Sequence, residues 1–101
     1  MSRPLIVQLD METFCEETDL TVACVIEIVE HGILEPQGRD PGDWRFDDFE
    51  LSIAKRAVKL RSDLEIDWEG VALALELLEE VRQLRAENRM LKQRLERFTP
   101  D

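Results

Sequence analysis

The feature that most constrains this chain is an uninterrupted helical pattern that occupies its last third. Asp67 can cap a helix that begins at Trp68, and nothing in the sequence stops that helix before about Phe98. About 30 residues at 1.5 Å each make ~45 Å of helix, whereas a compact chain of 101 residues is only about 30 Å across. The sequence therefore predicts a helix that protrudes from its domain or packs against a partner.

A heptad pattern runs along this helix. Its seam steps alternately by four and three residues and consists of Leu77, Val81, Leu84, Asn88, Leu91, Leu95 and Phe98. A single Asn among apolar a positions is a known way to specify register and oligomeric state. The flanking charges suit a parallel pair, in which Glu80 would meet Arg85 of a second copy, and Glu87 would meet Lys92. We expect homodimerisation through this seam, and the alternative is that the stripe folds back on the chain's own core.

Two short helices joined by a tight turn are predicted before residue 33. Asp10 can cap a helix from Met11 to about Glu17, and Thr21 can cap the next one. The apolar residues of the second helix recur at the spacing of one helical face, namely Val22, Val25, Ile26 and Val29. Gly32 suits a left-handed position that ends this helix. The pattern is that of a helix-turn-helix.

A β-hairpin wing is predicted next. A polar loop from Gln37 to Asp43 separates two short extended pieces, Ile33–Pro36 and Trp44–Phe46. A short strand is also expected at Leu5–Leu9, and Asp47 or Asp48 can cap a third helix. The core face expected for that helix consists of Phe49, Ile53, Ala57, Leu60 and Leu64.

The expected fold is therefore mostly α: a winged helix-turn-helix with a small β wing, a third helix, and a long C-terminal heptad helix. We divide it into residues 1–66 and 67–101, which together form one structural domain.

Catalysis is not expected. His31 lies next to Gly32 at a helix end, where it suits a cap better than a catalytic base. Cys15 and Cys24 have no metal-binding spacing and suit small buried thiols, so no metal or cofactor is expected. No apolar segment is long enough for a signal peptide or a membrane span, and the free thiols suit a reducing compartment, so we expect a cytoplasmic protein.

The charge distribution points to the kind of partner. Residues 1–50 hold three basic and thirteen acidic residues, so they carry the whole net charge of −10, while the second half is balanced. Residues 22–30, which would read DNA in a helix-turn-helix, contain no Lys, Arg or Asn but two carboxylates, Glu27 and Glu30. Pressing these acids against phosphates would be repulsive. A basic protein surface is therefore the favoured partner, with no direct nucleic acid and no membrane.

The candidate partner-binding face is acidic, and its alternative interpretation is a solvated surface without a partner. Trp44 either packs the wing on the core or anchors a contact. The face consists of Glu12, Glu16, Glu27, Glu30, Asp43 and Trp44.

The order of elements resembles MerR-type winged-helix regulators, with His31–Pro36 at the junction between the helix and the wing. More closely, the chain resembles the CbpM chaperone-modulator family over roughly residues 5–98. The resemblance is carried by Phe14-Cys15, Glu27-Ile28-Val29, Gly32, Glu35-Pro36, Trp44, Phe46-Asp47-Asp48, Lys55–Arg61, Asp67-Trp68, Gly70, Ala72–Leu75, Glu87-Asn88-Arg89, Gln93-Arg94-Leu95 and Arg97-Phe98.

The resemblance to the CbpM family implies a non-enzymatic inhibitor of CbpA, a DnaJ-like co-chaperone. Members of the family bind the J domain of CbpA, block its stimulation of the DnaK ATPase and suppress its DNA binding. A J domain presents a basic helix, which the acidic face could occupy, but the resemblance does not say which residues touch it. MerR relatives dimerise through an antiparallel last helix, so the resemblance and the flanking charges disagree on the orientation of the dimer.

Two other functions stay open at this point. One is a MerR-like DNA-binding transcription regulator, in which a partner or ligand compensates for the missing base-reading side chains. The other is an oligomerisation adaptor that acts only through residues 77–98.

Overall fold

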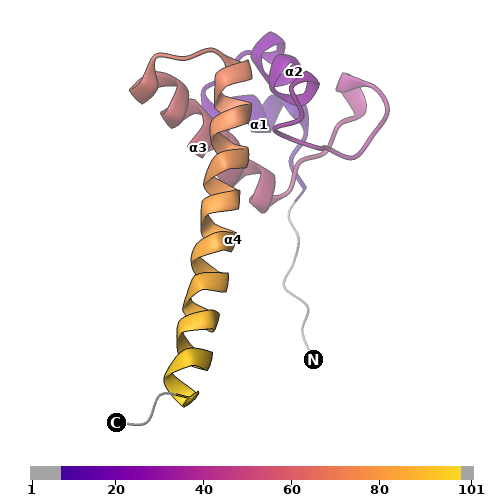
Figure 1. Ribbon diagram of the computed structural model, residues 1–101. Coiled ribbons are helices and arrows are strands. Elements are labelled where there is room, and N and C mark those ends of the chain that lie inside the picture. The colour runs from indigo at the N-terminus through magenta and orange to yellow at the C-terminus, as the bar shows by residue number, and fades with distance from the viewer. Residues whose placement is uncertain (1–7, 99–101) are drawn as a thin grey trace, which may run out of the picture.

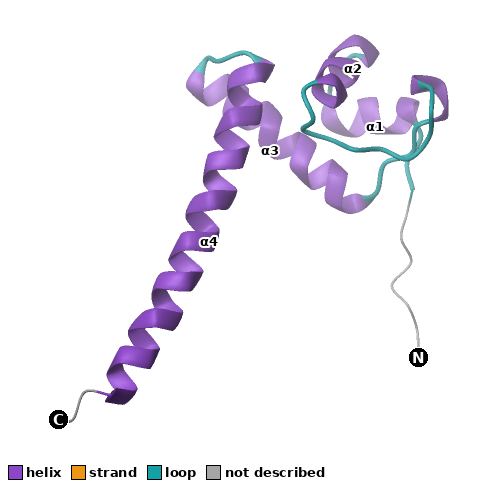
Figure 2. Cartoon of the chain, turned by 45° about the vertical axis from the view of Figure 1, so that its right-hand side comes forward, coloured by secondary structure: helices purple, strands orange, loops and turns teal. Residues whose placement is uncertain are grey.

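The computed structural model describes residues 8–98, and they form four α-helices. These are α1 (Met11–Thr18), α2 (Val22–Glu30), α3 (Asp48–Leu64) and α4 (Trp68–Phe98), with a short 3-10 turn, η1 (Pro41–Asp43), between α2 and α3. Helices α1, α2, α3 and the first turn of α4 form a lobe, from which the rest of α4 extends as a shaft (Figures 1 and 2). The predicted mostly α architecture is confirmed, and the division at residue 66 stays a prediction.

Polar caps start all four helices where the sequence predicts them. The Asp10 carboxylate accepts a hydrogen bond from the Thr13 N–H at 2.9 Å, and the Thr21 hydroxyl accepts one from Cys24 at 3.2 Å. Asp67 accepts from the Gly70 N–H at 2.9 Å in the same way. Each cap satisfies a backbone N–H that has no partner within its helix.

Helix α3 begins with a capping box, and Asp47 rather than Asp48 is its cap. The Glu50 N–H donates to Asp47 Oδ1 at 2.8 Å, and the Asp47 N–H donates to Glu50 Oε1 at 3.3 Å. This reciprocal pair determines where the wing ends and α3 begins.

The core of the lobe lies between the helix-turn-helix and α3. Phe14 of α1 stacks on Phe46 with ring centroids 3.9 Å apart, and Trp44 meets Phe46 edge-on at 6.4 Å. Trp68 closes the other side, where the Arg61 guanidinium lies 4.4 Å from its ring. The buried apolar residues are Phe14, Val25, Ile28, Leu34, Trp44, Phe46, Ala54, Ala57, Trp68 and Val71.

Two predicted core faces need correction. In α2 the buried residues are Val25 and Ile28, whereas Val22 is 48% exposed, because the helix turns its Val25–Ile28 side toward Phe14 and α1. In α3 the buried residues are Ala54 and Ala57, while Phe49 and Leu64 at the two ends are exposed. Small alanines let α3 pack closely against α1, so the larger residues at the ends of α3 extend past the contact.

Among residues 8–98, the predicted β structure is limited to two isolated bridges. Gln37 pairs with Arg45 across the wing, and Leu9 pairs with Phe46. Trp44 and Phe46 are buried and Arg45 is exposed, as the predicted alternation requires. The rest of the expected strand at Leu5–Leu9 lies mostly outside the described residues. The polar loop from Gln37 to Asp43 is too irregular for a longer ladder because Pro41–Asp43 forms the 3-10 turn.

The shaft makes the molecule elongated. Its Cα radius of gyration is 18.3 Å, against about 13 Å expected for a compact chain of this length. Only Trp68 and Val71 of α4 are buried, both in its first turn. The 31 residues of α4 span about 46 Å, so the predicted protruding helix is confirmed.

The wing turn depends on Gly38. Its φ is +119°, and a Cβ there would lie 2.8 Å from the carbonyl oxygen of Asp43. We expect Gly38→Ala to destabilise the protein by about 1–3 kcal/mol, because the backbone would have to move. Gly42→Ala is the matched control, since a Cβ there meets nothing within 4 Å. Urea unfolding measures both, and an equal shift of the two midpoints would contradict this account of the turn.

Candidate partner-binding surface

The first part of the candidate surface lies on α1. Glu12 and Glu16 are four residues apart, so they share a face of this helix, and both are exposed. Phe14 and Thr18 hold the opposite side in the core, where the Thr18 hydroxyl donates to the Phe14 carbonyl oxygen at 2.8 Å. The buried side of α1 therefore directs its acidic side to solvent.

The second part lies on α2, which packs against α1. Glu27 and Glu30 are three residues apart and exposed, while Val25 and Ile28 are fully buried. The helix ends at His31, whose N–H donates to the Glu27 carbonyl oxygen at 3.0 Å, and Gly32 follows with a φ of +75°. This is the predicted helix end, with His31 as a cap.

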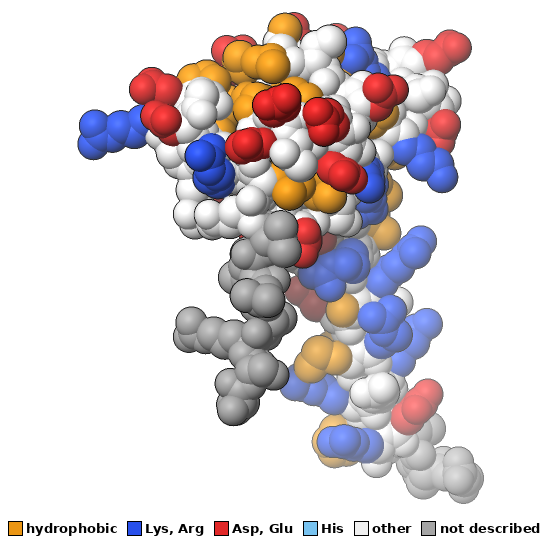
Figure 3. All heavy atoms as spheres, turned by 180° about the vertical axis from the view of Figure 1, so that it is seen from behind, with side chains coloured by type: hydrophobic (Ala, Val, Ile, Leu, Met, Phe, Trp, Pro, Cys, Tyr) orange, Lys and Arg blue, Asp and Glu red, His pale blue; other side chains and the backbone are white. Residues whose placement is uncertain are grey.

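The two wing residues of the candidate face, Asp43 and Trp44, differ in their exposure. Asp43 is exposed in η1, but Trp44 retains only 8% of its surface and packs against Phe46. The indole therefore supports the wing from inside and presents little area to a partner. Acidic side chains gather over the lobe, while basic side chains follow the shaft (Figure 3).

The heptad seam on α4 is a second candidate surface. Its apolar side chains are 41–85% exposed, from Val81 to Phe98. Asn88 lies among them and is exposed as well. Among residues 8–98, nothing on the lobe covers this part of α4, so the seam does not fold back on the chain's own core.

A cavity between α3 and α4 is a feature that the sequence does not predict. It has a volume of about 520 Å³, and Phe49, Ile33, Ile53 and Leu75 provide much of its apolar lining. Phe49 is 71% exposed at its edge, although the helical periodicity placed it in the core. Helical periodicity cannot reveal that Phe49 is exposed, because the position in the core next to Phe14 is occupied by Phe46, three residues earlier.

Glu50 is a second residue that sequence reasoning missed. Its Oε1 belongs to the capping box, but its Oε2 is buried without a hydrogen-bond partner. Burial raises the pKa of Glu50, and the nearby carboxylates of Asp47 and Glu35 raise it further against the lowering effect of hydrogen bonds. The Asp-x-x-Glu spacing of the capping box was the available signal, but it does not reveal burial.

The described residues give little support for metal binding, thiol chemistry or a membrane span. No three His, Cys, Asp or Glu side chains between residues 8 and 98 are grouped as a metal site requires. Cys15 and Cys24 are free and half-buried, and burial raises the pKa of the Cys15 thiol, which lowers its reactivity. Within the same residues, even α4 lacks an apolar stretch long enough to span a bilayer.

Comparison with known proteins places this architecture in a class of regulators. The family described as "MerR HTH family regulatory protein" matches residues 9–93, which include the helix-turn-helix, the wing, α3 and most of α4. The fold is therefore that of a MerR-type helix-turn-helix protein.

Individual relatives narrow this class. The chain is 69% identical over 98 residues to the chaperone modulatory protein CbpM of Pseudomonas putida (strain F1), covering 97% of both chains. It is 68% identical over 99 residues to CbpM of Pseudomonas entomophila, covering 98% of both chains, and 48% identical over 92 residues to CbpM of Salmonella paratyphi B, covering 91% of both. This chain belongs to the CbpM family of chaperone modulatory proteins, and the resemblance in the sequence is confirmed.

The partly buried carboxylate of Glu50 leads to a pH-dependent prediction. A folded-state pKa above the unfolded one means that the ionised group costs stability at neutral pH, and that the cost disappears once both states are protonated. Glu50→Gln keeps an oxygen that can accept from the Asp47 N–H, so we expect a higher urea midpoint at pH 7 and a difference that shrinks toward pH 4.

Asp48→Asn is the matched control for this prediction, because Asp48 is exposed in the same turn of α3. We expect it to leave the midpoint unchanged or to lower it, since an acid near a helix N-terminus is favourable. A Glu50→Gln variant that is less stable at pH 7 than at pH 4, relative to the unmodified chain, would contradict the assignment.

Proposed function

We propose that this chain inhibits a CbpA-type, DnaJ-like co-chaperone by binding its J domain through the acidic face of α1 and α2. The bound chain would cover the basic helix expected of a J domain and thereby block stimulation of DnaK and DNA binding by the co-chaperone. The relatives are named chaperone modulatory proteins, which supports the modulating role. The family description names a regulatory protein and the relatives' names a modulatory protein, which supports a non-enzymatic role.

One observation favours the acidic face over the rest of the lobe as the partner-binding surface. A MerR-type fold uses its second helix for recognition, and here the exposed charges of α2 are the carboxylates Glu27 and Glu30. This helix retains the position of a reading helix on the surface but has the charge that repels phosphate and attracts a basic protein. The acidic residues of α1, which packs against α2, extend the same charge.

Charge reversal tests this proposal. Glu27→Lys together with Glu30→Lys should weaken J-domain binding at least about tenfold at low salt, because two attractive contacts become repulsive. Titration of a fluorescently labelled CbpA J domain, with the full chain, measures the change. Raising the salt concentration should weaken binding by the unmodified chain, since exposed charges are screened.

Asp63→Lys together with Glu65→Lys provides the matched control. Both residues are exposed where α3 gives way to α4, and their reversal changes the net charge by the same amount. We expect binding to fall by less than about threefold. No saturable binding at low salt, or an equal loss in both double variants, would overturn the proposal.

The family match to MerR-type regulators supports one rival function, which is sequence-specific DNA binding. A gel-shift assay with genomic fragments at low salt separates the two. Specific retardation by the chain alone would favour the regulator, whereas the charge of α2 leads us to expect none.

We further propose that the seam on α4 joins two copies. Exposed apolar side chains along about 30 Å of helix, together with Asn88, fit a coiled-coil contact. The orientation is left to the experiment, since the flanking charges suit a parallel pair and MerR relatives pair antiparallel.

Leu84→Glu together with Leu91→Glu should abolish the dimer, because two carboxylates would enter the seam. Sedimentation velocity at micromolar concentration measures the oligomeric state. Gln83→Glu with Gln93→Glu, off the seam on the same helix, should leave it unchanged. A monomeric unmodified chain at that concentration would refute the dimer and leave the J-domain proposal to its own test.

A further inference from the structure

The second half of the chain is neutral as a whole, but its basic residues are concentrated near the C-terminal end of α4. Between residues 82 and 98, six basic residues stand against two acidic ones, a net charge of +4, while the rest of the chain carries −14. The basic segment is the outer part of the shaft, and the lobe lies in the acidic remainder of the chain (Figure 3). The proposed J-domain contact uses only acidic residues of the lobe and leaves the basic residues 82–98 without a role.

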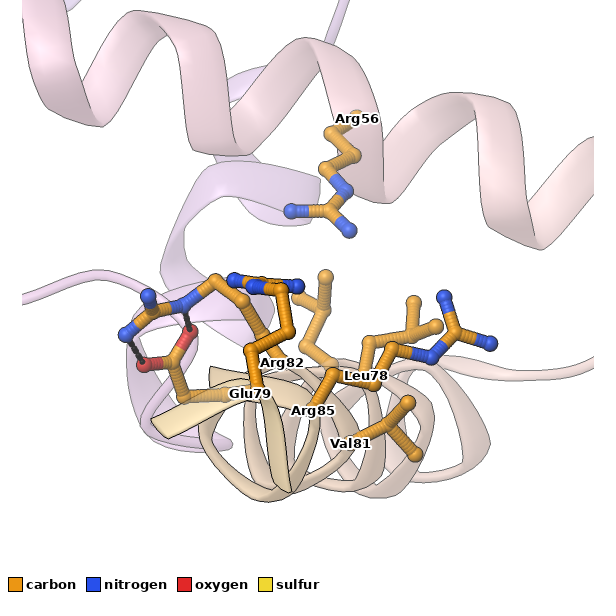
Figure 4. Close-up of a pocket in the computed structure, with 8 residues that line it drawn as sticks. Arg56, Leu78, Glu79, Val81, Arg82 and Arg85 are labelled. Carbon is orange, nitrogen blue, oxygen red and sulfur yellow. Dashed lines mark hydrogen bonds and ion pairs between the residues drawn. The ribbon is translucent and has the colours of Figure 1, made fainter. Parts of the chain in front are cut away.

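Arginines converge in the angle between α3 and α4. A cavity of about 380 Å³ is lined by Arg56 from α3 and by Arg82, Arg85 and Arg89 from α4. Figure 4 shows the Arg56 guanidinium extending from α3 toward the guanidinium groups of α4. These positions on α4 lie three and four residues apart, so they form one row along the helix.

Most of this positive charge has no counter-ion. Glu79 accepts two hydrogen bonds from Arg82, at 2.7 and 3.0 Å, and these hold the pKa of Glu79 below its ordinary value. Arg56 contributes weakly to the same effect. Among residues 8–98, no carboxylate forms an ion pair with Arg56, Arg85 or Arg89.

The contact between Arg82 and Glu79 shows how a guanidinium of this row can hold a carboxylate. It is a two-point contact between a guanidinium and a carboxylate, the geometry in which Arg is stronger and more selective than Lys. From Arg82 to Arg89 the row extends about 10 Å along the helix. That length suits several carboxylates in line rather than one small anion.

The rest of the cavity favours a protein segment. Leu75, Leu78 and Val81 line the same space beside the arginines, and Leu78 and Val81 are about 40% exposed. A long polyphosphate or nucleic acid backbone would have no use for these apolar contacts. A helix with carboxylates on one side and apolar residues beside them matches both parts of the lining.

We propose that Arg56, Arg82, Arg85 and Arg89 form a second docking surface, which binds an acidic amphipathic helix of a partner protein. This surface lies between α3 and α4 and not on the face proposed for the J domain, so the chain can hold a basic and an acidic partner surface at once. It meets the heptad seam at Val81, so the test includes the oligomeric state. The inference does not depend on the J-domain proposal.

The test is a titration of the full chain with a fluorescein-labelled synthetic helical peptide. The peptide carries Glu at positions i, i+3 and i+7 and Leu beside them, and a second peptide of the same composition distributes its Glu residues around the helix. We expect the ordered peptide to bind at least tenfold more tightly than the dispersed one. Equal affinity, or tighter binding of a linear polyphosphate of the same charge, would overturn the proposal.

Matched variants locate the site. Arg56→Ala with Arg89→Ala removes one guanidinium from each helix and should weaken peptide binding at least tenfold. Lys59→Ala with Arg97→Ala removes one base from each of the same helices outside the cavity and should change binding less than threefold. An equal loss in both would show nonspecific attraction and contradict the proposal.

Two further readouts separate the other outcomes. Binding of the J domain by Arg56→Ala/Arg89→Ala should be unchanged, so failure of one proposal does not imply failure of the other. Sedimentation velocity should show the same oligomeric state as the unmodified chain. Dissociation of that variant would mean that a second copy covers the surface, which overturns the assignment to a partner helix.

Discussion

The stacked contact between Phe14 and Phe46 holds the lobe together. It joins α1 of the helix-turn-helix to the residue at which the chain leaves the wing, and the two rings are fully buried 3.9 Å apart. Leu9 pairs with Phe46 through two backbone hydrogen bonds, at 2.7 and 2.9 Å, and the capping box of α3 begins at the next residue. One aromatic pair thus determines the positions of α1, the wing and α3, and through them which carboxylates of α1 and α2 reach the surface.

The core of the lobe is too small to bury more than the start of α4. The lobe can bury only the first turn of a 31-residue helix, at Trp68 and Val71. Apolar and basic side chains therefore remain exposed along the shaft. Residues 82–98 of the shaft carry a net charge of +4 and the rest of the chain carries −14, so the molecule is suited to bring unlike surfaces together rather than to enclose a substrate.

Local signals in the sequence were sufficient for the helices and their starts. Asp10, Thr21 and Asp67 each precede an apolar periodic run, and each caps its helix as predicted. Local signals failed where packing decides the outcome. A spacing of three and four residues fits two overlapping faces of a helix, so periodicity favours Val22 where packing buries Ile28. It also predicts Phe49 in a core that Phe46 already fills. The approach of Arg56 to Arg82 depends on the angle between α3 and α4, for which the sequence has no signal.

We propose that the acidic face of α1 and α2 binds a basic helix of the J domain. Hydrogen–deuterium exchange of the full chain, with and without a saturating CbpA J domain, tests it residue by residue. We expect slower exchange in residues 11–30 and little change in the wing loop or in residues 82–98. Protection confined to the shaft or the wing, with residues 11–30 unchanged, would contradict the account.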